Sequence, residues 1–233
     1  MNVSSENKKG IDMKTITKNV YSLKELLDLN KDKKIAYHAV QKVKDNIAQW
    51  FASNEIITEI VIETTWGAAL EAVGFKDAKF QWSGFSCQGD GASFTSNCEM
   101  EKLVTWFTQP VVPSESYEEN NLLSWLAHKL KGQVQNQAYK TIKDEFELNV
   151  IRMDSRYSHE RTCSVMAKFH NEPSETDGIS LQFVQDVENL RLEICQAVYR
   201  DLNQEHDYLT SDEILIEFDE TNEFQWDIQG NQE

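Results

Sequence analysis

The residues best suited to acid–base chemistry lie in the stretch DSRYSHERT, residues 154–162. His159 has the pKa range of a general base, and Asp154 or Glu160 would orient its ring and stabilise its charge. If two β-hairpins lie side by side in one sheet, Asp90 would approach His159. Such a set would serve hydrolysis of a nucleotide or a nucleic acid. The same residue types also suit a polar turn that holds only local salt bridges.

A nucleophile that would complete such a site is not obvious in the sequence. Cys163 and Ser164 follow the stretch directly, but they lie in a predicted strand. The sequence has no Gly-x-Ser-x-Gly elbow and no His-Glu-x-x-His pair. Catalysis is therefore the alternative interpretation, and non-catalytic binding is the preferred one.

A second unusual stretch, QWSGFSCQGDGASF, has a glycine-rich break at Gln88, Gly89, Asp90 and Gly91. The break lacks the Gly-Lys-Ser/Thr ending and the following helix of a phosphate-binding loop. It has one acid where a calcium loop needs several. Glycine tolerates positive φ, and aspartate is a favoured turn residue. We therefore predict the tip of a β-hairpin, with a binding role for the tip as the alternative.

The four cysteines, Cys87, Cys98, Cys163 and Cys195, show neither a Cys-x-x-Cys spacing nor a histidine at zinc-finger distance. The chain also lacks an apolar signal core near its N-terminus. We therefore expect these cysteines to be reduced, buried and inert. We predict neither a metal site nor a cofactor.

Most of the formal net charge of −16 lies in the last part of the chain. Residues 172–233 carry 17 Asp or Glu against 2 Arg, whereas residues 1–171 carry 22 Asp or Glu against 21 Lys or Arg. Such a field repels nucleic acid and membrane phosphates and attracts a basic protein surface. Solubility alone is the competing explanation. The residues predicted to bind a basic partner are Glu188, Glu193, Asp201, Glu205, Asp207, Asp212, Glu213, Glu217, Asp219 and Glu220.

Hydrophobic periodicity predicts the elements that would position these residues. Apolar residues at spacings of three and four predict helices over 22–29, 30–51, 55–73, 99–107, 117–143, 179–205 and 210–218. Alternation predicts strands over 15–22, 78–85, 91–98, 146–153, 162–169 and 223–228. Strands and helices are grouped rather than strictly alternating, which favours an α+β fold. We expect an antiparallel sheet, built from two β-hairpins plus terminal strands and packed against several long helices.

The predicted organisation is a flexible lead over residues 1–13 and a single α+β domain over 14–233. Met13 is a candidate natural start, and a proline-containing stretch at 109–116 is a candidate sub-boundary. No apolar run approaches 18 residues, so we expect no membrane span. Together with the missing signal core, this predicts a cytoplasmic protein.

Three segments, taken in order, resemble a group of uncharacterised proteins encoded by bacteriophages and prophages. They are the hairpin QWSGFSCQGDGASF, the turn RYSHERTCSV and the C-terminal VYRDLNQEHDYLTSDEILIE. The resemblance runs from Phe80 to the C-terminus and carries over no catalytic residue. It implies a phage-derived protein in the cytoplasm of a bacterial host cell.

Together, the charge and the resemblance predict a non-catalytic inhibitor. Its acidic C-terminal surface would mimic a nucleic acid toward a host nucleic-acid-handling complex or a defence complex of the CRISPR or restriction type. A hydrolase that uses a polar site between the two hairpins is the alternative.

Overall fold

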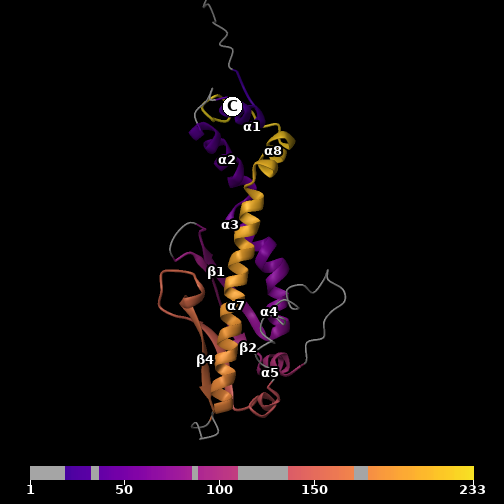
Figure 1. Cartoon of the computed structure of the whole chain (residues 1–233), viewed down its shortest axis with the longest axis vertical. Coiled ribbons are helices and arrows are strands. Elements are labelled where there is room, and N and C mark those ends of the chain that lie inside the picture. Colours follow the sequence, from indigo (N-terminus) through magenta and orange to yellow (C-terminus); the bar gives the residue numbers. More distant parts are fainter. Residues whose placement is uncertain (1–18, 33–36, 86–88, 110–135, 171–177) are drawn as a thin grey trace, which may run out of the picture. The chain divides into compact units, whose positions relative to one another are not determined.

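The computed structural model describes residues 19–32, 37–85, 89–109, 136–170 and 178–233, which form two compact units (Figure 1). Unit 1 takes its described residues from the chain up to Phe51 and from Thr210 onward, and unit 2 spans Ala52–Leu209. The single domain predicted over residues 14–233 remains a prediction, since a division into two compact units does not decide how many domains the chain has. The lead at 1–13, Met13 and nearly all of the candidate sub-boundary at 109–116 lie outside the described residues.

Unit 2 is built on a four-stranded antiparallel sheet of order β1-β2-β3-β4, which confirms the predicted α+β class and both hairpins. The strands are β1 (Phe75–Ser83), β2 (Gly91–Cys98), β3 (Phe146–Arg152) and β4 (Cys163–Phe169). Within each hairpin the pairing runs the length of the strands, apart from an irregularity in β1 between Lys76 and Lys79. Between β2 and β3, by contrast, only Ser96↔Val150 and Asn97↔Asn149 pair.

Helices cover one face of this sheet, and the long helix α7 (Gly178–Leu209) lies along it (Figure 1). The other helical elements of the unit are α3 (Asn54–Thr58), the π-helical η1 (Glu59–Trp66), α4 (Gly67–Val73) and α5 (Met100–Thr108). The predicted helix over 55–73 is therefore continuous but changes its winding in the middle. It ends at Gly74, whose φ of 117° places it in the left-handed region that glycine tolerates. Apolar residues from the strands and from α7 form the buried core.

Unit 1 contains α1 (Leu23–Lys31), α2 (Tyr37–Phe51) and α8 (Asp212–Thr221), which pack around a smaller apolar core. Ser22 caps α1, because its side chain accepts from the Glu25 amide while the Glu25 carboxylate accepts from the Ser22 amide. The Ser211 side chain caps α8 by accepting from the Ile214 amide. These caps fix where each helix begins.

Two predicted strands and part of one predicted helix take another form. The described parts of the strands over 15–22 and 223–228 make only isolated bridges in unit 1, Tyr21↔Trp226 and Trp226↔Gln232. The helix predicted over 117–143 lies outside the described residues up to 135. Its described end contains the 3-10 helix η2 (Gln137–Thr141), because the Asn136 side chain accepts from the Ala138 amide and starts a new, tighter turn.

No helix in the described residues combines the length and the apolar character that crossing a bilayer requires.

Candidate functional site

The tip of the first hairpin, at residues 89–91, lies against the tip of the second hairpin, at residues 157–159, in unit 2. A Cβ atom at Gly91 would lie 2.6 Å from the Cβ of His159 and 2.8 Å from its Cα. A Cβ atom at Gly89, whose φ is 108°, would lie 2.9 Å from the ring of Tyr157. Both glycines therefore allow the backbone of one tip to approach the other. Gln88, the remaining residue of the predicted tip, lies outside the described residues.

The predicted acid–base residues come from these touching tips, but their side chains have separate surroundings. The Asp90 carboxylate lies beside Gly84, where a Cβ would be 2.6 Å from Oδ2. Burial, followed by the negative charge of Asp90, raises the pKa of Tyr199, and the Tyr199 hydroxyl donates to the Gly84 carbonyl at 3.1 Å. Asp90 therefore takes part in the contact between the first hairpin and α7.

His159 serves the local turn. Its Nδ1 accepts from the Arg161 amide at 3.2 Å and caps the short 3-10 helix η3 (Glu160–Thr162). An Nδ1 that accepts in this way carries no proton, so the neutral ring is protonated on Nε2. The Glu160 carboxylate lies 3.9 Å from Nδ1 and 3.8 Å from the guanidinium of Arg161, and Asp154 is exposed. This geometry is that of a structured polar turn.

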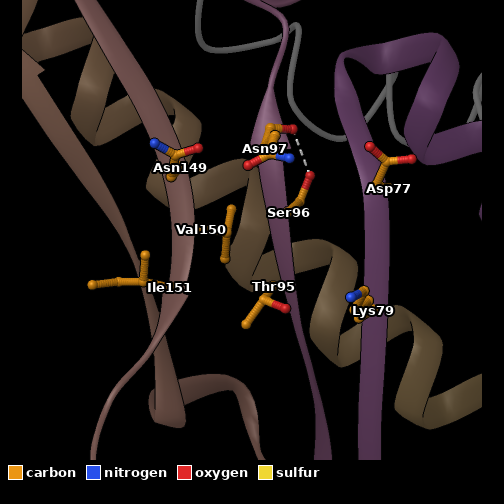
Figure 2. Close-up of a pocket in the computed structure, with 8 residues that line it drawn as sticks. All are labelled: Asp77, Lys79, Thr95, Ser96, Asn97, Asn149, Val150 and Ile151. Atoms are coloured by element: carbon orange, nitrogen blue, oxygen red, sulfur yellow. Dashed lines mark hydrogen bonds between the residues drawn. The ribbon is translucent and has the colours of Figure 1, made fainter.

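A hollow with a volume of about 690 Å³ lies on the sheet. Figure 2 shows its lining, which comes from three neighbouring strands: Asp77, Lys79, Thr95, Ser96, Asn97, Asn149, Val150 and Ile151. The hollow includes the residues at which β2 and β3 pair. None of the four predicted acid–base residues lines it.

A second, narrow crevice lies beside the hollow, where β2 and β3 are no longer paired, and it is too narrow to admit a water molecule. Phe94 and Arg152 line its walls, and Cys163 reaches it from the start of β4. The sulfur of Cys163 accepts from the backbone amide of Phe94, which lies in the part of β2 that has no partner in β3. The cysteine thus occupies a gap in the sheet.

Behind the crevice lies a buried cluster of two thiols and an arginine. Arg191 of α7 is only 1% exposed, and its Nη1 lies 3.1 Å from Cys163 Sγ and 3.7 Å from Cys195 Sγ. Hydrogen bonding from Cys195, together with the charge of Arg191, lowers the pKa of Cys163 to about 6 despite its burial. The pKa of Cys195 is raised by its hydrogen bond to Cys163 and by burial. Sequence reasoning expected these cysteines to be inert and missed the cluster.

The same arginine is held by a carboxylate that had been assigned to partner binding. Glu188 accepts from Nε of Arg191 at 2.9 Å and from Nη2 at 2.6 Å, and it also accepts from the Val165 amide. Its carboxylate is therefore committed inside unit 2. Other acids of α7 are engaged similarly, since Asp201 accepts from the Trp66 indole at 3.1 Å.

The predicted acidic face does not run along α7. Five of its exposed positions carry uncharged polar side chains, namely Gln182, Gln185, Asn189, Gln196 and Gln204, and others carry Ile179, Leu181, Arg200, Asp207 and Tyr208. Glu193 and Glu205 are half-buried, and Asp207 is exposed and accepts from Asn203. Of the acids of this helix that were predicted to bind a partner, Glu188 and Asp201 are thus used in contacts inside unit 2.

The α8 helix does present such a surface. Glu213, Glu217 and Glu220 are exposed and lie at positions i, i+4 and i+7, which share one side of a helix. We call these three residues the acidic stripe. Asp212 is also exposed, but it forms an ion pair with Lys44 of α2.

Asp219, also predicted to bind a partner, is buried with 1% exposure. Its two carboxylate oxygens accept from the Leu23 amide and from the Trp226 indole, both at 2.7 Å. Burial raises the pKa of Asp219. This residue ties α1, α8 and the C-terminal segment together and belongs to no surface.

The described residues contain no group of three or more His, Cys, Asp or Glu side chains placed to hold a metal ion.

The comparisons with known proteins identify a family. The model of a domain of unknown function, DUF8835, matches residues 45–212. The chain belongs to the DUF8835 family. The match contains all of unit 2, with both hairpin tips and the thiol cluster, and it ends at the first residue of α8. No curated protein and no solved structure matches the chain.

Proposed function

We propose that this protein is a non-catalytic binding protein that engages a basic partner through the acidic stripe of α8. The observation that carries the proposal is the outward alignment of Glu213, Glu217 and Glu220 within a segment that has no positive charge of its own. Residues 210–233 contain eight Asp or Glu and no Lys or Arg. The potential at the stripe is therefore strongly negative.

The stripe is costly for the helix that carries it. Like charges at i and i+4 destabilise a helix by about 0.2–0.5 kcal/mol per pair. Two contacts of α8 offset this cost. Ser211 caps the helix, and the buried Leu215 and Asp219 hold its inner side. A carboxylate array held in place against its own repulsion favours a role in recognition over a role in solubility alone.

The spacing of the stripe suits a surface that normally binds a phosphate backbone. Steps of four and three residues correspond to axial rises of about 6 Å and about 4.5 Å. One strand of DNA carries a charge about every 3.4 Å along its axis. The stripe therefore has about two-thirds of the linear charge density of a DNA strand. A basic groove on a protein would be attracted to it by the same long-range field.

The resemblance to phage-encoded proteins supplies the setting of the proposal. The partner would be a host protein in the bacterial cytoplasm, part of a nucleic-acid-handling complex or a defence complex of the CRISPR or restriction type. The protein would inhibit it by occupying its nucleic-acid groove.

The alternative, a hydrolase between the hairpins, has weaker support. Gly91 and His159 are in contact, which does bring Asp90 and His159 into one region. However, the accepting nitrogen of His159 is engaged by the Arg161 amide, and Asp90 faces Gly84. A base whose acceptor atom is already used cannot take a substrate proton without disrupting the turn.

The test is capture of the partner from a bacterial lysate at low and high salt, followed by competition with duplex DNA. The decisive variant is the triple change Glu213→Lys, Glu217→Lys and Glu220→Lys. Its matched control reverses three exposed glutamates of unit 2, Glu55, Glu59 and Glu63, and so changes the net charge equally.

We expect the wild type and the control to retain a DNA-binding protein that duplex DNA displaces and that high salt weakens. The stripe variant should retain none of it. If the stripe variant captures the same partner with unchanged salt dependence, or if DNA fails to compete, the proposed function is wrong.

A further inference from the structure

We propose that Cys163 and Cys195 form a peroxide-reactive dithiol, in which Cys163 is the residue attacked first and Cys195 resolves it into an intramolecular disulfide. The proposal goes beyond the binding function. It concerns unit 2 alone, whereas the acidic stripe belongs to unit 1.

The sulfur of Cys163 accepts from Nη1 of Arg191 at 3.1 Å, and hydrogen bonds from the thiol of Cys195 and the backbone amide of Phe94 lower its pKa. Its contact with an acceptor, the Glu160 carbonyl, is long at 4.0 Å. A sulfur surrounded by donors and a fixed cation is stabilised as the thiolate, which is the nucleophilic form of cysteine. Cys195 and Cys163 are thus placed as a hydrogen-bond donor and its acceptor.

The arginine cannot easily turn away from the thiols. Its Nε and Nη2 are both bonded to Glu188, and Nη1 also donates to the Glu160 carbonyl at 2.7 Å. Glu188 is itself held by the Val165 amide of β4. The planar guanidinium is therefore fixed on both edges, and its charge stays beside Cys163.

The break in the sheet provides the route of access. Because β2 and β3 pair only at Ser96↔Val150 and Asn97↔Asn149, the two strands separate beside Phe94. The narrow crevice there is lined by Lys79 and Arg152 and reaches Cys163. Cys163 is only 2% exposed and the crevice is too narrow for a water molecule, so a small oxidant enters only when the unpaired strands separate, and a bulky one is excluded.

The chemistry balances with hydrogen peroxide as the oxidant. The Cys163 thiolate attacks one peroxide oxygen, an S–O bond forms, the O–O bond breaks, and hydroxide leaves to be protonated by solvent. The sulfur of Cys195 then attacks the sulfenic sulfur of Cys163, which forms the S–S bond and breaks the S–O bond. The departing hydroxide takes the proton that Cys195 loses. Two thiols are oxidised, and one peroxide is reduced to two waters.

Cys98 provides an internal control in the same unit. It is more exposed than Cys163, but burial of its thiol raises its pKa to about 12. At pH 7, a thiol of pKa about 6 is roughly nine-tenths ionised, whereas one of pKa about 12 is ionised on the order of one part in 10⁵. Exposure and thiolate character thus predict opposite orders of reactivity for these two residues.

The experiment uses the full chain with Cys87→Ser, so that Cys98, Cys163 and Cys195 remain. The protein is treated with hydrogen peroxide and analysed by non-reducing peptide mass spectrometry. We expect a Cys163–Cys195 disulfide and an unmodified Cys98. In the Cys195→Ser variant, we expect a sulfenic acid at Cys163 that a small 1,3-dione traps.

A pH series distinguishes a reactive cluster from a merely buried one. Among the described residues, the charged groups around Cys163 and its crevice are Arg191 with its partner Glu188, Arg152 and Lys79, and the neighbouring thiol is Cys195. The peroxide rate should therefore follow the ionisation of Cys163 across the series. We expect it to rise through about pH 6 and to be more than about tenfold faster than at Cys98 at pH 7.

Three results would overturn the proposal: no disulfide, equal or faster modification of Cys98, or no trapped sulfenic acid at Cys163 in the Cys195→Ser variant. The serine variant keeps a side chain of similar size, and its circular dichroism spectrum verifies that it is folded. The acidic stripe takes no part in this experiment, so its outcome is independent of the binding function.

Discussion

Replacing Gly91 with alanine tests how the two hairpin tips are packed. Gly91 opens β2, and the structure places His159 Cβ only 2.6 Å from the added methyl group, with His159 Cα at 2.8 Å. The φ angle of Gly91 is not positive, so the substitution costs no backbone strain and the penalty is steric alone. One of the two tips must move if the methyl group is to fit.

The turn that carries His159 cannot withdraw freely. The His159 carbonyl accepts from the Thr162 amide at 2.9 Å and from the Thr162 hydroxyl at 2.7 Å, while Met153 donates to the Thr162 carbonyl at 2.9 Å. Overpacking at a constrained site costs about 1–3 kcal/mol. For a unit of this size, each 1 kcal/mol corresponds to about 2–4 °C in Tm, so we expect a loss of about 2–12 °C.

The matched control is Gly67→Ala, the same substitution in a helix. The added Cβ there would have the Ile62 carbonyl oxygen at 3.5 Å as its nearest neighbour, which is ordinary contact. Alanine is favoured over glycine inside a helix by about 0.5–1 kcal/mol, so this variant should be slightly more stable than the wild type. Urea and thermal unfolding, followed by circular dichroism, measure both variants.

His159→Ala in the Gly91→Ala background sharpens the test. Alanine keeps the Cβ and Cα atoms that the new methyl group would meet, so we expect no rescue of stability. A Gly91→Ala protein at least as stable as the wild type, or a full rescue by His159→Ala, would refute the packing described for the tips.

Three further predictions concern buried and like-charged groups. Burial raises the folded-state pKa of Asp219. Its protonated carboxyl group therefore stabilises the folded protein fully below the unfolded pKa of about 3.9, and this stabilisation is lost as pH rises through the raised folded-state pKa. Urea unfolding across pH should show this fall in the free energy of unfolding in the wild type and not in Asp219→Asn. Glu217→Gln removes one of three aligned like charges and should stabilise unit 1 by about 0.2–0.5 kcal/mol per relieved pair while weakening partner capture. Arg191→Met leaves Glu188 without its cation and should cost about 3–5 kcal/mol, part of which Glu188→Gln should recover in the double variant.

Local pattern was enough to predict the sheet. Alternation and the glycine-rich break gave the first hairpin, and the polar stretch between two β-branched segments gave the second. The periodicity of apolar residues did not predict the structure where contacts between residues distant in sequence are made. Trp226 makes isolated bridges instead of a strand, and its indole is held by Asp219 of α8. In η2, Tyr139 donates to Asp186 of α7, a contact that a helical period does not contain.

Some of the site residues could likewise be predicted from local sequence, and others could not. The helical period predicts that Glu213, Glu217 and Glu220 share one side, and they do. The net charge of a segment does not reveal which carboxylates bind groups from other elements, so Glu188 and Asp219 were misassigned to a surface. Cys195 stands four residues after Arg191 on α7, which is the local signal for their contact. That Cys163 joins them from β4 was not readable in the sequence.

The limits of the family match separate the two proposed properties of the chain. The match ends at residue 212, so the hairpin tips and the thiol cluster lie within it and the acidic stripe lies beyond it. A chemistry that belongs to the DUF8835 domain would therefore reside in unit 2, and stripe-dependent binding would be a property of the segment that follows. The triple charge reversal on α8 should then abolish partner capture and leave the peroxide rate of Cys163 unchanged, while Cys163→Ser should do the reverse. If either variant removed both properties, one shared site would have to account for them, and the division of roles between the units would be wrong.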